Sequence, residues 1–185
     1  MVELKTFTNA DLPEAYAHQI RDFVRIYWFD VYKFSSQEPV SPDELSPIYH
    51  VMVDGQALYS SVTIVRRLIR HEGVEYMCYG LSAVLTYPYF RKRGYASQLV
   101  QAATDRIRQS PDADIAWLQT GPDLGGFYVR FGWEHMPQLK ILSGDPNEPK
   151  VEPDGFFMLL FVSDKAKANR HILENAPLYL GPYLW

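Results

Sequence analysis

Three consecutive basic residues and a glycine stand where a predicted strand passes into a predicted helix. Residues 87–103 read YPYFRKRGYASQLVQAA, and the part that could do chemistry is Arg91, Lys92, Arg93, Gly94, Tyr95 and Ala96. A helix N-terminus exposes unpaired backbone N–H groups and a partial positive charge, so it attracts phosphate. Glycine lets an oxygen-rich ligand approach the backbone, and the basic side chains add charge for a pyrophosphate or a ribose phosphate. Residues 91–96 are therefore a candidate phosphate-binding loop.

This loop also has a plainer interpretation as a solvated basic turn, because short charged connections are common. The segment is neither a dinucleotide fingerprint nor a Walker loop, since it lacks both Gly-x-Gly-x-x-Gly and Gly-Lys-Ser/Thr. The choice between the two interpretations depends on the elements that surround the loop.

The composition excludes several classes of protein. The 185 residues carry a net charge of −4 with a pI near 5.7, so a general affinity for nucleic acid or an anionic membrane is not expected. A lone cysteine, Cys78, lies in an apolar run and predicts a buried thiol rather than a disulfide framework or a zinc site. The sequence has neither a signal-peptide pattern nor a stretch of about 20 apolar residues, which predicts a soluble, cytoplasmic protein. No metal is expected.

The N-terminal third predicts a short strand, a helix and a loop. VELKTF alternates as a strand does, and apolar residues of the next segment recur at helical spacing. Asp11 and Glu14 form a capping-box pattern around Pro13, which is tolerated in a first turn. The segment SSQEPVSPDELSP carries three prolines and predicts a loop.

The remainder alternates between strands and helices. PIYHVMV, ALYSSVTIVRRLI and VEYMCYGLSAVLTY predict three strands, joined by turns at Asp54-Gly55 and Glu72-Gly73. A helix follows from Ala96, then a strand IAWLQT, a brief helix before Gly132, and strands at EHMPQLKIL and FFMLLFV. The pattern predicts an α/β layer structure, with residues 1–185 as a single domain and a C-terminal tail of about 165–185 packed on it.

Two motifs in this order resemble those of the Gcn5-related N-acetyltransferases. Pro88-x-x-Arg91-x-x-Gly94-x-Ala96 is similar to that family's acetyl-CoA signature, Arg/Gln-x-x-Gly-x-Gly/Ala after a strand. GFYVRFGW resembles its Phe-Tyr-x-x-x-Gly-Phe element, with Trp133 in place of the second Phe. The resemblance covers about residues 48–133 well.

The resemblance implies a fold, a cosubstrate and a site. The fold would be a central mixed, mostly antiparallel sheet flanked by helices, α/β or α+β in class, with splayed central strands. Backbone N–H groups of Arg91 to Ala96 would bind the pyrophosphate of acetyl-CoA. Val84 and Thr86 would offer backbone groups to the pantetheine arm and the thioester carbonyl. Tyr128 would protonate the leaving thiolate, since an ordinary tyrosine pKa near 10 is close to that of a thiol, about 8.5.

The general base and the acceptor stay open. Glu75, Glu134, His135 and His50 are candidate bases, but water can relay the amine proton, so none is nominated. The expected reaction is transfer of an acetyl group to a primary amine of a small molecule. A CoA-binding sensor without turnover is the alternative, and a cofactor-free structural protein is a third class.

Substrate class and assembly are less determined. The C-terminal Trp185 faintly resembles aminoglycoside 2′-N-acetyltransferases, but Ser82 and Tyr183 replace two of their acidic residues. We favour tail anchoring by Tyr179, Tyr183 and Trp185. The aromatic residues of IYWFDVYKF have three possible roles: they could contact a hydrophobic acceptor, belong to the core or form a homodimer contact.

Overall fold

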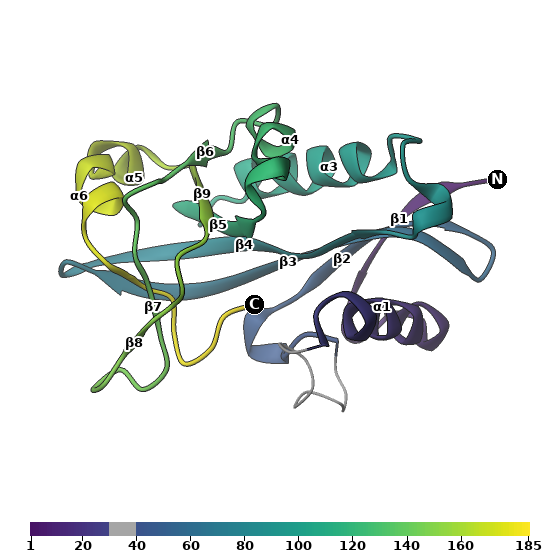
Figure 1. Cartoon of the computed structure of the whole chain (residues 1–185), viewed down its shortest axis with the longest axis horizontal. Coiled ribbons are helices and arrows are strands. Elements are labelled where there is room, and N and C mark those ends of the chain that lie inside the picture. The colour runs from purple at the N-terminus through teal and green to yellow at the C-terminus, as the bar shows by residue number, and fades with distance from the viewer. Residues whose placement is uncertain (30–39) are drawn as a thin grey trace. The chain divides into compact units, whose positions relative to one another are not determined.

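The computed structural model describes residues 1–29 and 40–185 (Figure 1). The strands are β1 (Glu3–Thr8), β2 (Ile48–Asp54), β3 (Ala57–His71), β4 (Val74–Thr86), β5 (Ile115–Thr120), β6 (Glu134–His135), β7 (Ile141–Ser143), β8 (Lys150–Val151), β9 (Phe156–Phe161) and β10 (Leu178–Tyr179). The α-helices are α1 (Glu14–Tyr27), α3 (Tyr95–Gln109), α4 (Gly125–Val129), α5 (Asp164–Ala168) and α6 (Arg170–Asn175). Short 3₁₀ helices are η1 (Asp43–Leu45), η2 (Pro88–Phe90) and η3 (Pro122–Leu124).

The protein is a mixed α/β fold with a seven-stranded sheet, and the sheet is mostly antiparallel, as the family resemblance implied. The hydrogen-bonding order is β1-β2-β3-β4-β5-β9-β6, and β4 pairs with β5 in parallel. The chain forms two compact units. Unit 1 comprises residues 1–65 and 81–103, and unit 2 comprises residues 66–80 and 104–185. A single domain over residues 1–185 stays a prediction, as does the splaying of the central strands.

In unit 1, helix α1 packs on one face of an antiparallel β1-β2-β3 ladder (Figure 1). Tyr49 of β2 lies opposite Thr63 of β3, and Val51 lies opposite Ser61. Residues directly opposite each other in an antiparallel pair share one face of the sheet. The apolar core of this face is formed by α1 and β2 side chains together with Leu58 and Leu85: Tyr16, Ile20, Phe23, Val24, Tyr49, Val51 and Val53.

The start of α1 differs from the predicted capping box. Its N-cap is Pro13, which makes no side-chain cap, and Asp11 lies before the helix. The Asp11 carboxylate instead accepts hydrogen bonds from the Thr8 N–H and hydroxyl, at 2.5 and 2.6 Å. The capping prediction was wrong because the same carboxylate closes a turn after β1, a competing use that is common for aspartate.

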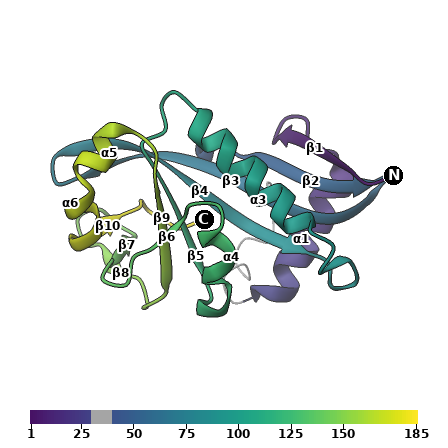
Figure 2. The same ribbon diagram turned by 90° about the horizontal axis from the view of Figure 1, so that it is seen from above.

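In unit 2, β5 is paired along its whole length with β9, from Ile115–Phe161 to Thr120–Phe156 (Figure 2). A second ladder, β10-β7-β8, stands in the same unit. Cys78 is fully buried in the unit's apolar core, as the sequence predicted, and burial raises the pKa of its thiol well above the ordinary value. Such a thiol is unreactive at neutral pH.

The predicted strand at residues 134–142 is two short strands, β6 and β7. Pro137 stands between them, and proline has no N–H to donate to a ladder. The Met136 N–H still donates to the Phe157 carbonyl at 2.9 Å, which is where the pairing with β9 stops.

The aromatic residues of the C-terminal segment have packing partners within unit 2. The Tyr179 hydroxyl donates to the Gly144 carbonyl at 2.6 Å. The Arg67 guanidinium lies 4.6 Å from the Tyr183 ring centroid, and Trp185 meets Trp117 edge to face at 5.5 Å. These contacts agree with the anchoring role expected of the tail residues.

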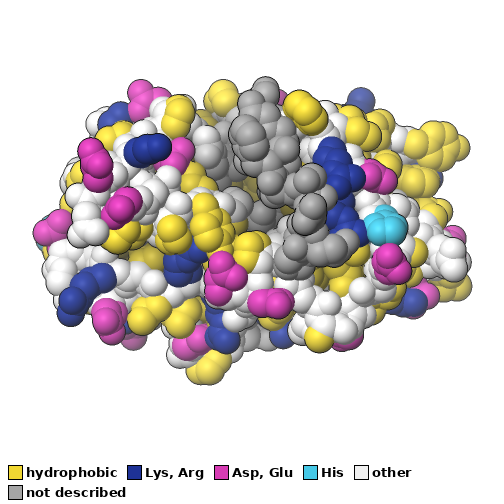
Figure 3. All heavy atoms as spheres, turned by 90° about the horizontal axis from the view of Figure 1, so that it is seen from below, with side chains coloured by type: hydrophobic (Ala, Val, Ile, Leu, Met, Phe, Trp, Pro, Cys, Tyr) yellow, Lys and Arg dark blue, Asp and Glu magenta, His cyan; other side chains and the backbone are white. Residues whose placement is uncertain are grey.

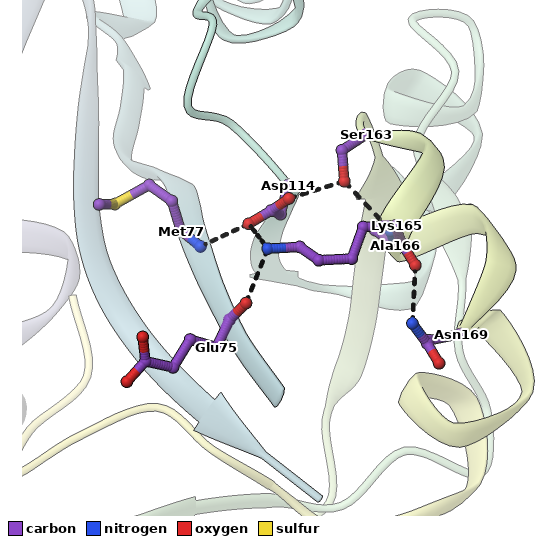
Figure 4. Close-up of polar contacts among 7 residues, drawn as sticks. All are labelled: Glu75, Met77, Asp114, Ser163, Lys165, Ala166 and Asn169. Carbon is purple, nitrogen blue, oxygen red and sulfur yellow. Dashed lines mark hydrogen bonds and ion pairs between the residues drawn. The ribbon is translucent and has the colours of Figure 1, made fainter. Parts of the chain in front are cut away.

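Asp114, just before β5, is the centre of a buried polar network (Figure 4). Its carboxylate accepts hydrogen bonds from the Met77 N–H (2.9 Å), the Ser163 hydroxyl (2.7 Å) and the Lys165 ammonium (2.7 Å). The Ser163 hydroxyl in turn accepts from the Ala166 N–H and caps α5. Burial by itself would raise the pKa of Asp114, but the hydrogen bonds outweigh it, and the pKa lies below its ordinary value.

We expect Asp114→Ala to lower the free energy of unfolding by about 3 kcal/mol, because three donors lose a charged acceptor. The carboxylate's contribution should persist above pH 4 and disappear as pH falls through its lowered pKa, since only the ionised form accepts all three bonds. Urea unfolding at pH 7 and pH 3 measures both effects. Asp164→Ala, at a fully exposed ion pair with Lys167, is the matched control and should cost less than about 1 kcal/mol. Equal losses in the two variants would contradict the assignment.

Candidate active site

The candidate phosphate-binding loop, residues 91–96, follows η2 and runs into the first turn of α3 in unit 1. The Gln98 N–H donates to the Gly94 carbonyl at 3.1 Å, so Gly94 precedes the first turn of α3. The first N–H groups of an α-helix have no acceptor within the helix, and here they belong to Tyr95, Ala96 and Ser97. Gly94 has a φ of +81°, which favours glycine, and Lys92 also has a positive φ of 61°. The loop therefore presents backbone donors at the N-terminus of a long helix.

Two arginines of the loop are positioned by aromatic rings. The Arg91 Nε donates to the Thr86 carbonyl at 3.2 Å, and its guanidinium lies 5.6 Å from the Tyr27 ring centroid. The Arg93 guanidinium lies over the Tyr89 ring. Both arginines are exposed, so their charge remains available to an anion.

The two strand residues assigned to the pantetheine arm, Val84 and Thr86, lie at the end of β4 in unit 1 and are half-buried. The Thr86 hydroxyl is 2.7 Å from the Ser60 hydroxyl, which donates to the Leu85 carbonyl at 2.6 Å. Ala83 has a φ of +47°, a conformation that residues with a Cβ rarely adopt. A positive φ inside a strand turns the next backbone groups out of the regular ladder direction. Val84 directly follows this irregularity.

Tyr128 lies in α4 of unit 2 and is 6% exposed. Burial raises the pKa of its phenol to about 12, and a side-chain hydrogen bond with Thr120 acts in the opposite direction. This value corrects the expectation from sequence, which took the ordinary tyrosine pKa. A phenol of this kind is protonated throughout the physiological range, so it can supply a proton or a hydrogen bond there but cannot act as a general base.

The residues after Tyr128 hold the end of α4. Gly132 has a φ of +87°, and a Cβ there would collide with the Arg108 guanidinium, which donates to the Phe131 carbonyl at 2.7 Å. Trp133 is 1% exposed, and its indole N–H donates to the Thr104 hydroxyl at 3.1 Å. Glycine and a large aromatic residue are thus both required by packing within unit 2.

The structure places the expected site residues in two groups. Val84, Thr86 and residues 91–96 belong to unit 1, where one continuous stretch of chain carries them. Tyr128 belongs to unit 2. Their roles toward a cosubstrate stay predictions.

Three of the four candidate bases have side-chain partners of their own. His50 is 5% exposed, and its Nδ1 lies 2.7 Å from the Thr6 hydroxyl. Glu134 pairs with the Arg170 guanidinium at 2.5 Å, and His135 is stacked on Phe156 at 3.7 Å. The Glu75 side chain is exposed, and the backbone carbonyl of this residue accepts a hydrogen bond from the Lys165 ammonium. None of these contacts singles out a general base.

Two buried hydroxyls were not singled out by the sequence. Ser61 and Thr63 of β3 are both 0% exposed, and among the described residues their hydroxyls have no hydrogen-bond partner. Buried polar groups without a protein partner are commonly satisfied by water or a ligand. The run SSVT in an otherwise apolar strand was the available signal.

The aromatic cluster at the end of α1 is partly described. Tyr27, Trp28 and Phe29 are 45%, 38% and 62% exposed, and the ring of Tyr27 stacks on Phe23 at 4.4 Å. Tyr32 and Phe34 lie outside the described residues. The alternatives of acceptor contact, core and dimer contact therefore stay open.

Three further findings concern metal-ligating clusters, membrane-spanning helices and surface charge. Within residues 1–29 and 40–185 no group of His, Cys, Asp or Glu side chains could hold a metal ion. Helices in the same residues include none with the length and apolar character needed to cross a membrane. On the face shown in Figure 3, basic and acidic side chains are interspersed.

Comparison with protein-family models identifies the family of this chain. The family model described as an acetyltransferase (GNAT) domain matches residues 3–136. Among curated proteins, none matches the chain in sequence.

Several solved structures share the fold. The chain is similar to the GNAT family N-acetyltransferase YhbS from Escherichia coli, solved in complex with CoA, with 16% identity, a TM-score of 0.61 and coverage of 97% of this chain and 90% of that chain. An acyl-CoA N-acyltransferase from Pseudomonas aeruginosa matches with 15% identity, a TM-score of 0.56 and coverage of 86% and 99%. A probable N-acyltransferase from Enterococcus faecalis V583 matches with 19% identity and a TM-score of 0.54; the match covers 78% of this chain but only 38% of that one. At these identities the likeness concerns the fold.

Proposed function

This chain belongs to the acetyltransferase (GNAT) domain family, and from that premise we propose that it transfers an acetyl group from acetyl-CoA to a primary amine of a small molecule. The observation that carries the proposal is the loop of residues 91–96, where glycine, basic side chains and helix N–H groups coincide. The CoA-bound structure of YhbS, a protein of similar fold, supports the choice of cosubstrate. The similarity to aminoglycoside 2′-N-acetyltransferases stays a prediction.

The proposed cosubstrate contacts follow the chain. Backbone N–H groups of Arg91, Lys92, Arg93, Gly94, Tyr95 and Ala96 bind the pyrophosphate, and the basic side chains of the loop offset its charge. Val84 and Thr86 present backbone groups to the pantetheine arm and the thioester carbonyl. The positive φ of Ala83 supports this role, because an irregularity of this kind inside a strand re-aims the backbone groups that follow it.

The reaction requires a neutral amine, a polarised carbonyl and a stabilised leaving group. The amine nitrogen attacks the thioester carbonyl carbon, the C–S bond breaks, and the thiolate must gain a proton to leave as CoA. Complete proton transfer from a phenol of pKa about 12 to a thiolate of ordinary pKa, about 8.5, would be unfavourable by about 5 kcal/mol. We therefore propose that Tyr128 donates a hydrogen bond to the sulfur, and that the proton released by the amine finally neutralises it.

The alternative is a CoA-binding sensor that keeps the fold without turnover. Two measurements separate the possibilities: calorimetric titration with acetyl-CoA, and free-thiol release with acetyl-CoA across classes of primary amine. Binding together with amine-dependent thiol release is the expected result. Binding with no release across the amines would favour the sensor, and no binding would remove both. Cytoplasmic location and a homodimer stay predictions.

A further inference from the structure

Ser61 and Thr63 are buried hydroxyl residues in the middle of β3, in unit 1. They stand two positions apart, so both side chains lie on the same face of the strand. Ser61 lies opposite Val51 and Thr63 lies opposite Tyr49, so this is the face on which α1 packs. Both side chains are 0% exposed, and neither hydroxyl has a hydrogen-bond partner among residues 1–29 and 40–185. The pair is therefore a candidate contact for a bound molecule.

The adjacent hydroxyl of the same strand is already engaged. The Ser60 hydroxyl donates to the Leu85 carbonyl at 2.6 Å and lies 2.7 Å from the Thr86 hydroxyl. These bonds offset the cost of burying Ser60. Ser61 and Thr63 are buried as deeply, but among the described residues nothing offsets the burial of their hydroxyls.

The pair lies beside the strand residues assigned to the thioester. The Tyr87 N–H donates to the Tyr59 carbonyl at 3.0 Å. Strands β3 and β4 are joined by a tight turn and run antiparallel, so this bond places Ser61 opposite Leu85. Leu85 belongs to the apolar cluster that packs on α1, which agrees with this register. The two hydroxyls thus lie on the α1 face of the sheet at the level of residues 84–86.

We propose that Ser61 and Thr63 bind a hydroxyl group of the acceptor, which makes the acceptor an amino alcohol. The inference rests on the proposed function, because it takes the thioester to lie at Val84 and Thr86. Each side-chain hydroxyl is both a donor and an acceptor. A ligand hydroxyl can therefore donate to one of the two and accept from the other.

A neutral group suits this place better than a charged one. The residues opposite the pair in the neighbouring strands, Val51, Tyr49 and Leu85, are uncharged. A carboxylate or an ammonium group among them would lose its hydration without gaining an opposite charge. A methyl group would leave both hydroxyls unpaired, which makes an alkylamine a poorer ligand. Because both hydroxyls are closed to solvent, the apolar side chains over the pair shift when the acceptor enters.

Free-thiol release with acetyl-CoA tests the proposal on straight-chain amino alcohols, each compared with the alkylamine of the same length. In kcat/KM the native protein should favour the amino alcohol by about tenfold or more, because the alkylamine leaves buried hydroxyls unpaired. Ser61→Ala combined with Thr63→Val should lose this preference, while the KM for acetyl-CoA stays unchanged. Thr63→Ser keeps the hydroxyl and should keep the preference.

Ser60→Ala is the matched control, because it removes a hydroxyl from the same strand that has partners within the protein. Its thermal unfolding midpoint should fall by about 3 °C, and its preference for amino alcohols should remain. The double variant of Ser61 and Thr63 breaks no hydrogen bond among the described residues, so its midpoint should stay close to that of the native protein.

The outcomes separate the subsite from the proposed function. Equal rates with amino alcohols and alkylamines, or a double variant that keeps the native preference, would overturn the subsite and leave the proposed function intact. Thiol release with other primary amines but with neither series would have the same meaning. A double variant with a midpoint as low as that of Ser60→Ala would show that the pair is bonded within the protein, which also overturns the subsite. Native protein that releases no thiol with any primary amine would overturn the proposed function and the subsite together.

Discussion

Gly94→Glu should abolish acetyl-CoA binding at concentrations where the native protein binds with micromolar affinity. Glutamate brings a carboxylate to the N–H groups that the pyrophosphate needs, where it competes for the donors and repels the phosphates. The positive φ of Gly94 adds about 1–2 kcal/mol of backbone strain for a residue with a Cβ. Together these effects should weaken binding by at least about a hundredfold, which calorimetric titration measures directly.

Controls divide this effect into its parts. Gly55→Glu places the same charge at another positive φ, +57°, in the turn between β2 and β3, with open space around its Cβ, and should bind acetyl-CoA normally. Gly94→Asn adopts the left-handed conformation readily, so it should lose little affinity. If the native protein does not bind acetyl-CoA, RKRGYA is a charged turn and the acetyltransferase proposal fails with it. Normal binding by Gly94→Glu would show that acetyl-CoA binds elsewhere.

The elements that the sequence predicted best are those decided by a local pattern. The run IAWLQT became β5, Ile115–Thr120, without adjustment, because a short apolar run between turn signals is typical of a buried strand. The helix expected from Ala96 became α3, Tyr95–Gln109, since its apolar positions recur at helical spacing. Gly94 was identified from its place between a predicted strand and a predicted helix, as a residue that lets a ligand approach the backbone, and its φ of +81° is a further finding of the structure.

Features that depend on distant parts of the chain were not predictable. The positive φ of Ala83 has no signal in the sequence, because alanine is an ordinary strand residue. The pKa of Tyr128 is raised by burial of its side chain, which is 6% exposed. The sequence does not distinguish this tyrosine from one such as Tyr89, whose side chain is 79% exposed. Asp11 was assigned to the wrong motif because a helix cap and a turn use the same carboxylate, and only the position of Thr8 distinguishes them. In each case tertiary packing selects one local option among several.

The second large effect is expected on turnover, when the Tyr128 phenol is removed. Tyr128→Phe should lower the turnover number by about a hundredfold, the usual contribution of a positioned proton or hydrogen-bond donor, and leave acetyl-CoA affinity nearly unchanged. With a pKa of about 12, the phenol keeps its proton between pH 7 and pH 10, so the native rate should not fall in that range through ionisation of Tyr128. Thiol release under saturating acetyl-CoA and the best amine of the panel measures both.

The matched control is Tyr76→Phe, which removes a phenol from a 1% exposed ring of the same unit. It should leave turnover unchanged, because Tyr76 belongs to the apolar core. If Tyr128→Phe and Tyr76→Phe both turn over like the native protein, Tyr128 has no part in the chemistry and the proton must reach the sulfur by another route. A decline of the native rate centred near pH 10 and absent from Tyr128→Phe would show a phenol ionising in its ordinary range. The raised pKa would then be wrong, and direct protonation of the thiolate by Tyr128 would again be energetically feasible.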